Sequence, residues 1–143
     1  MGLPDATKGI QNLFKAMYSS GAPQTLLDLV HMRASQINGC GACIHAGVQA
    51  ARKAGESDDR LLQLPGWRDA DCFTDAERAA LKLTEAVTRL ADRGEVVDDQ
   101  LWDEVADHFD ERELSAVILM IATTNMVNRI NTTIRVPAGT TWE

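Results

Sequence analysis

The sequence has little basic charge. Its 143 residues include 14 lysines and arginines against 21 aspartates and glutamates, which gives a formal net charge of −7. No basic stripe is available to neutralise the phosphates of a nucleic acid or of an anionic lipid surface. We therefore expect neither a nucleic-acid partner nor an anionic-membrane partner.

The sequence also lacks a long apolar segment. Its longest apolar run covers residues 116–122, far fewer than the roughly 20 residues that a helix needs to cross a bilayer. Residues 1–5 contain no basic segment followed by an apolar stretch, which is the pattern of a signal peptide. We therefore expect no membrane association and a cytoplasmic location.

Alternating strand patterns and internal repeats are absent as well, and apolar residues recur at helical spacing. Ile10, Leu13, Phe14, Met17 and Tyr18, for example, form one stripe along a helix. The length suits one domain covering residues 1–143, which is large enough to bury a core without disulfide or metal staples. We predict an all-α fold, a compact multi-helix bundle.

Capping residues indicate where several helices begin. Thr74 with Glu77, and Asp110 with Glu113, have the spacing of a capping box. The predicted helices cover residues 10–18, 23–36, 40–54, 57–64, 74–92, 98–109 and 111–133. The tail, residues 136–143, is expected to be irregular.

Two segments suggest contacts between subunits. The helix at 23–36 is apolar almost all round, so it is either buried or part of an oligomer interface, and the run at 116–122 also suggests apolar surface hidden between subunits. Asn125, Asn128, Arg129 and Asn131 form a polar strip late in the last helix. That strip could line a site, but we favour a buried subunit contact.

Cysteine is scarce, and two of the three cysteines are close together. Cys40 and Cys43 form a C-x-x-C pair at the predicted start of a helix, and Cys72 is the third. Helix N-termini favour thiolates, and a spacing of three residues lets the sulfurs form a disulfide. We interpret the pair as a redox dithiol. Half of a zinc site and two small core residues are the alternatives. Helix position alone favours Cys40, the more exposed of the two, as the attacking thiol.

Residues 35–43, Ser-Gln-Ile-Asn-Gly-Cys-Gly-Ala-Cys, resemble the signature of the carboxymuconolactone decarboxylase superfamily, in its alkylhydroperoxidase D (AhpD)-like branch. The resemblance continues through residues 51–56, 64–68, 73–81, 121–125 and 128–129. It implies an all-helical domain that assembles as a homo-oligomer, often a trimer or hexamer. It also implies peroxidase activity in which the second cysteine of the pair attacks the peroxide.

The resemblance assigns roles to individual residues. Cys43 becomes the peroxidatic thiol and Cys40 the resolving one. Asp28 stands twelve residues before Cys40, where the family has a glutamate. Its place in an apolar helix predicts a raised pKa and a proton-transfer role, with a paired structural acid as the alternative. The family histidine that follows the cysteines is replaced by Gly47. His31, three residues after Asp28 on the same face, is a candidate substitute or a structural histidine.

The sequence therefore predicts a thiol-dependent alkylhydroperoxidase that uses Cys43, Cys40, Asp28 and His31 and needs no cofactor or metal. Its expected partners are an organic hydroperoxide and a dithiol or protein reductant. A redox-sensing dithiol protein with weak peroxidase activity is the main alternative, favoured by Gly47. A decarboxylase acting on a lactone acid is a third hypothesis. The C-x-x-C pair argues against it, because decarboxylases of this superfamily do not depend on such a pair.

Overall fold

The computed structural model describes residues 2–140. Within them the chain forms seven α-helices and one 3-10 helix, with no strand. The elements are α1 (Pro4–Tyr18), α2 (Gln24–Asn38), α3 (Gly41–Lys53), α4 (Asp58–Gln63), η1 (Leu64–Asp69), α5 (Asp75–Thr88), α6 (Asp99–Ala106) and α7 (Glu111–Thr133). The all-α prediction is confirmed.

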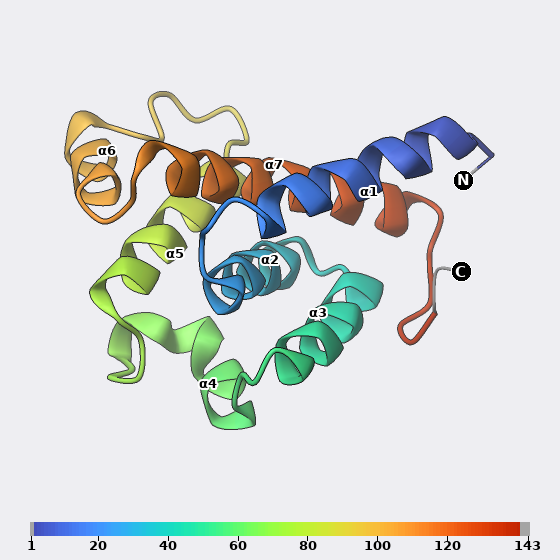
Figure 1. The fold of residues 1–143 in the computed structure, drawn as a ribbon, viewed down its shortest axis with the longest axis horizontal. Coiled ribbons are helices and arrows are strands. Elements are labelled where there is room, and N and C mark those ends of the chain that lie inside the picture. The colour runs from blue at the N-terminus through green and yellow to red at the C-terminus, as the bar shows by residue number, and fades with distance from the viewer. Residues whose placement is uncertain (1, 141–143) are drawn as a thin grey trace.

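Helix α2 is the centre of the fold. It packs against α3, α5 and α7, and α1 runs beside α7 above it (Figure 1). Leu27, Val30 and Ala34 on α2 are completely buried inside the chain, so the alternative that this helix forms an oligomer interface is wrong. Four of residues 116–122 are buried inside the chain, whereas Ile118, at 42%, and Ala122 are exposed.

The predicted helix bounds agree with the structure to within about two residues, except at the start of α1 and at the ends of α5 and α6. Both capping boxes are present, at the N-termini of α5 and α7. Helix α5, however, ends at Thr88 instead of residue 92, because the exposed Leu90 has no core to pack against. Helix α1 begins earlier than predicted, with Pro4 in its first turn, a position that proline favours. Residues 136–140 are irregular as expected, and 141–143 lie outside the described residues.

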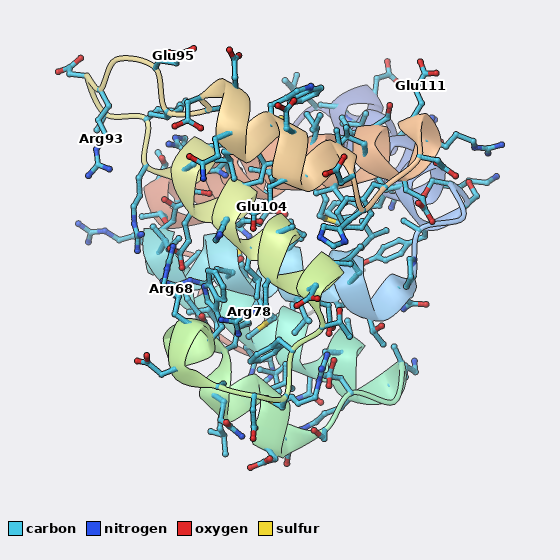
Figure 2. All side chains as sticks on the ribbon, turned by 90° about the vertical axis from the view of Figure 1, so that its left-hand side faces the viewer. Arg68, Arg78, Arg93, Glu95, Glu104 and Glu111 are labelled. Atoms are coloured by element: carbon cyan, nitrogen blue, oxygen red, sulfur yellow. A yellow bond between two sulfur atoms is a disulfide. The ribbon has the colours of Figure 1, made fainter. Side chains whose placement is uncertain are left out.

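Helix α4 ends at Gln63, one residue before the predicted end, and the chain then continues through Pro65 and Gly66 as η1. Trp67 on η1 is buried, and its indole N–H donates to Glu85 Oε1 over 2.8 Å. Figure 2 shows Arg68 and Arg78 where α5 meets η1, and their guanidinium groups lie 4.4 and 5.2 Å from the Trp67 ring. These contacts hold the η1 segment against α5. Within residues 2–140, no helix combines the length and apolar character needed to cross a bilayer.

Glu85 is a buried carboxylate that joins three elements. It accepts hydrogen bonds from Arg33 on α2 over 3.0 Å, and from Trp67 and Arg68 on η1 over 2.8 and 2.6 Å. Burial alone would raise the pKa of Glu85, but the bonds from Arg68, Trp67 and Arg33 outweigh it and lower the pKa to about 2. The ionised form of Glu85 therefore stabilises the fold.

We expect the protein to lose stability in acid through Glu85. A carboxyl whose pKa is lowered on folding contributes fully above its ordinary value of 4.5, and that contribution disappears as the pH falls towards 2. Urea unfolding between pH 7 and 2 measures the loss, and Glu85→Gln should remove this part of the pH dependence. Glu104→Gln, at the exposed pair with Lys82, is the control. Parallel curves for the wild type and Glu85→Gln would contradict the prediction.

Candidate active site

The two cysteines of the C-x-x-C pair are joined in a disulfide at the start of α3. Gly39, with φ at +67°, ends α2 in a left-handed conformation that glycine adopts freely and turns the chain into α3. Cys40 is the N-cap of α3, and its sulfur accepts the backbone N–H of Cys43 over 3.3 Å. Their Cα atoms are 5.3 Å apart, inside the usual range for disulfides. The prediction that the pair can form a disulfide is confirmed.

The disulfide lies below the surface. Cys40 is 2% exposed and Cys43 is 3% exposed, so the expectation that Cys40 is the more accessible thiol is wrong. Val127 on α7 and Val136 on the tail pack against the pair. A Cβ placed on Gly41 would lie 4.0 Å from Ala138. The tail that follows α7 therefore covers the beginning of α3, which a helix-position argument cannot anticipate.

Asn131 contacts the disulfide directly. Its side-chain amide donates to Cys43 Sγ over 3.3 Å, and Asn128 donates to Ser35 Oγ over 3.0 Å. Both asparagines are buried and bonded inside the chain, so neither side chain is available for a subunit contact. A subunit contact through the exposed Arg129 of the same strip stays a prediction. A signal was present in the sequence: asparagines at 125, 128 and 131 share one face of a largely apolar helix, and buried amides need partners.

His31 is held between α3 and α7. Its Nε2 lies 3.3 Å from the backbone oxygen of Cys43, and its Nδ1 lies 3.3 Å from Thr124 Oγ1. Burial lowers the pKa of His31 below its usual value, although the bond to the Cys43 carbonyl opposes this. The ring is therefore neutral at neutral pH, the form that can accept a proton.

Gly47 provides the space in which the His31 ring lies. A Cβ at this position would be 2.9 Å from His31 Cδ2 and 2.5 Å from Met32 Sδ, closer than packed side chains allow. The imidazole of His31 thus occupies the volume that a side chain at position 47 would need. The His31 ring on α2 can therefore pack in this position only because residue 47 on α3 is a glycine.

Asp28 is buried one turn before His31 on α2. Its Oδ1 accepts the Tyr18 hydroxyl over 2.8 Å, whereas its buried Oδ2 has no hydrogen-bond partner within residues 2–140. Burial raises the pKa of Asp28, and the Glu56 carboxylate adds to the rise, although the Tyr18 bond opposes it. The predicted raised pKa is confirmed. One oxygen of Asp28 is paired as in a structural acid, and the other is free to take a proton.

The site therefore draws on α2, α3 and α7. Helix α3 supplies the cysteines, α2 supplies His31 and α7 supplies Asn131. No motif in the sequence had indicated that Asn131 contacts the cysteine pair. Within the described residues, no group of three or more histidine, cysteine, aspartate or glutamate side chains is placed to hold a metal ion. A buried dithiol with a neutral imidazole and an amide donor beside it is suited to thiol redox chemistry.

Comparisons with known proteins agree with this arrangement. The model of the carboxymuconolactone decarboxylase family matches residues 4–86, more than half of the chain. The uncharacterized protein YdfG of Bacillus subtilis is 34% identical over 128 residues, 90% of this chain and 86% of that protein. A protein of unknown function from Agrobacterium tumefaciens, for which a role as the antioxidant defence protein AhpD has been suggested, has a similar structure. Its TM-score is 0.87 at 30% identity, over 97% of this chain and 94% of that one.

A more distant structural neighbour shares the fold alone. The debrominase Bmp8 superposes with a TM-score of 0.83 at 23% identity, over 94% of this chain and 72% of that chain. The overall fold is therefore shared with a protein of quite different sequence.

Proposed function

The chain belongs to the carboxymuconolactone decarboxylase family, and from that premise we propose that it is a thiol-dependent alkylhydroperoxidase. The observation that carries the proposal is the Cys40–Cys43 disulfide, with an amide donor on the Cys43 sulfur. The suggested antioxidant role of the Agrobacterium tumefaciens protein, which is 30% identical, supports it.

The proposed reaction starts from the reduced pair. The Cys43 thiolate attacks one peroxide oxygen, so that an S–O bond forms and the O–O bond breaks. The departing alkoxide takes up a proton and leaves as the alcohol. The Cys40 thiol then attacks the sulfenic sulfur of Cys43, the disulfide forms and water departs. A dithiol or protein reductant returns two electrons and two protons to complete the cycle.

We assign the proton transfer at Cys43 to His31 and Asp28. A carbonyl oxygen can only accept a hydrogen bond, so Nε2 of His31 carries the proton in the oxidised state and Nδ1 accepts from Thr124. To take a proton from the Cys43 thiol, His31 must adopt the other tautomer, in which Nδ1 carries the proton and Nε2 is free to accept one. Thr124 permits this tautomer because its hydroxyl can accept a hydrogen bond from Nδ1 as well as donate one to it. For Asp28 we propose the role of second proton acceptor, because its pKa is raised and one buried oxygen has no partner within residues 2–140. Its hydrogen bond is to Tyr18, and none of its contacts described above reaches His31 or Cys43.

Burial of the disulfide favours one other candidate function. Cys40 and Cys43 are almost inaccessible in the oxidised state, which also suits a redox-sensing dithiol that changes state slowly and has little peroxidase activity. The two functions differ in the rate at which the reduced pair reacts with peroxide. Assembly as a homo-oligomer stays a prediction from the family resemblance.

Stopped-flow oxidation of the reduced protein by cumene hydroperoxide tests the proposed function. In a Cys72→Ser background, which leaves two thiols per chain, we expect both thiols to disappear together as the disulfide forms. The rate should exceed that of a free cysteine by at least about 10², because general-base assistance alone contributes that much. Oxidation at the rate of a free thiol would support the redox-sensing alternative instead.

A further inference from the structure

A pocket between α1 and α7 adjoins the disulfide. Its volume is about 250 Å³, and apolar side chains make up most of its wall. The lining residues are Thr7, Ile10, Gln11, Phe14, Val127, Ile130 and Asn131. Two of them also contact the cysteine pair: Val127 packs against it and Asn131 donates to Cys43 Sγ over 3.3 Å. Two residues that line the pocket are therefore also in contact with the cysteine pair.

Another cavity along the same two helices has a different character. It is lined in part by Ser20, Glu111, Arg112 and Ser115, and none of its lining residues touches the cysteines in the contacts described above. The pocket near Cys43 thus differs from its neighbour both in its apolar wall and in its link to the sulfur. A largely apolar cavity with a small number of placed polar groups is the usual form of a small-molecule site.

We propose that the α1–α7 pocket binds the apolar substituent of the hydroperoxide and that Asn131 positions the peroxide group against Cys43. This inference rests on the proposed function and narrows its substrate class to hydroperoxides with a compact apolar group. The volume, about 250 Å³, is below the roughly 300–1,000 Å³ of sites for drug-sized ligands. It suits an aryl group or a short alkyl chain.

The chemistry of the two partners agrees with this placement. The substrate is polar only at its O–O group. Of the three polar lining residues, Thr7 and Gln11 lie on α1, and Asn131 is the one whose amide contacts Cys43 Sγ. With the apolar group in the pocket, we expect the O–O bond to lie beside Asn131, the lining residue that contacts Cys43 Sγ. The amide N–H of Asn131 can then donate to the thiolate or to the alkoxide oxygen that forms as the O–O bond breaks. Asn131 therefore acts as a positioning residue for the attack by Cys43.

A pair of tryptophan substitutions on α1 tests the pocket. Thr7→Trp fills it, and Ala16→Trp fills the other cavity along α1 and α7. We expect the wild type to have a kcat/KM at least about tenfold higher for cumene hydroperoxide than for hydrogen peroxide, since a few buried apolar groups discriminate by that factor. Thr7→Trp should reduce this ratio about tenfold, and Ala16→Trp should preserve it. The assignment is overturned if Thr7→Trp leaves this ratio unchanged, or if the wild type has the same kcat/KM for the two peroxides.

Asn131 needs a measurement that a purely structural role would not affect. Asn131→Ala should lower kcat/KM for both peroxides and move the rising limb of the pH–rate profile to higher pH, because the thiolate loses a donor. Asn131→Gln should recover part of both effects. A profile that does not move in Asn131→Ala contradicts the positioning role. If the folded wild type consumes neither peroxide, the proposed function itself fails; if it consumes both equally well, only the pocket assignment fails.

Discussion

Cys43→Ser should abolish hydroperoxide turnover, whereas Cys40→Ser should still react once per chain. A serine hydroxyl stays protonated near neutral pH and cannot replace a thiolate, so we expect Cys43→Ser to lose at least about 10³-fold in rate. Without Cys40, the sulfenic acid on Cys43 has no resolving thiol and should accumulate after one equivalent of peroxide. Peroxide consumption and the mass of the intact chain, 16 Da heavier for a sulfenic acid, measure the two outcomes.

The structure also contains a contact that favours Cys40 as the attacking thiol, and this pair of variants distinguishes the two assignments. The Cys40 sulfur accepts the helix N–H of Cys43, and that contact favours a thiolate on Cys40. The Cys43 sulfur instead receives the Asn131 amide and lies in the residue whose carbonyl contacts His31. A single turnover in Cys43→Ser with none in Cys40→Ser would reverse the roles. Cys72→Ser, at the free cysteine outside the pair, is the matched control and should keep full activity.

The features that the sequence predicted correctly depend on short separations. A capping box joins residues three apart, and the disulfide joins Cys40 and Cys43 with the same separation. Such contacts follow from helix geometry, so the motif alone determines them. The burial of Asp28 was also predictable, because its neighbours on α2 are apolar.

The features that the sequence missed depend on packing between distant segments. Asn131 reaches Cys43 across 88 residues, and the tail covers α3 only after α7 has brought it there. No local pattern records which face of α7 meets α3. The glycine at 47 looked like the loss of a catalytic histidine, yet it makes room for an imidazole from α2. The fact that a ring from α2 occupies the space of a side chain on α3 can be seen only once the packing of the two helices is known.

His31→Gln should lower kcat/KM for hydroperoxide by about 10² or more, the contribution of general-base help. Glutamine has nearly the same reach and can still bond to the Cys43 carbonyl and Thr124, but it cannot take a proton. Since burial lowers the pKa of His31, wild-type activity should persist below pH 6.5 and decline only at more acid pH. His45→Ala, at an exposed histidine two residues after Cys43, is the control. Wild-type activity in His31→Gln would make His31 a structural residue.

A double substitution separates the chemistry of the imidazole from its position on α2. In the wild-type background, Gly47→His forces a Cβ to within 2.9 Å of the His31 ring and 2.5 Å of Met32 Sδ, so the variant should unfold at a lower temperature. In a His31→Ala background the ring space is empty and only Met32 must move. The double variant should therefore be more active than His31→Ala alone. Equal activity of the two would show that an imidazole must come from α2 to serve Cys43.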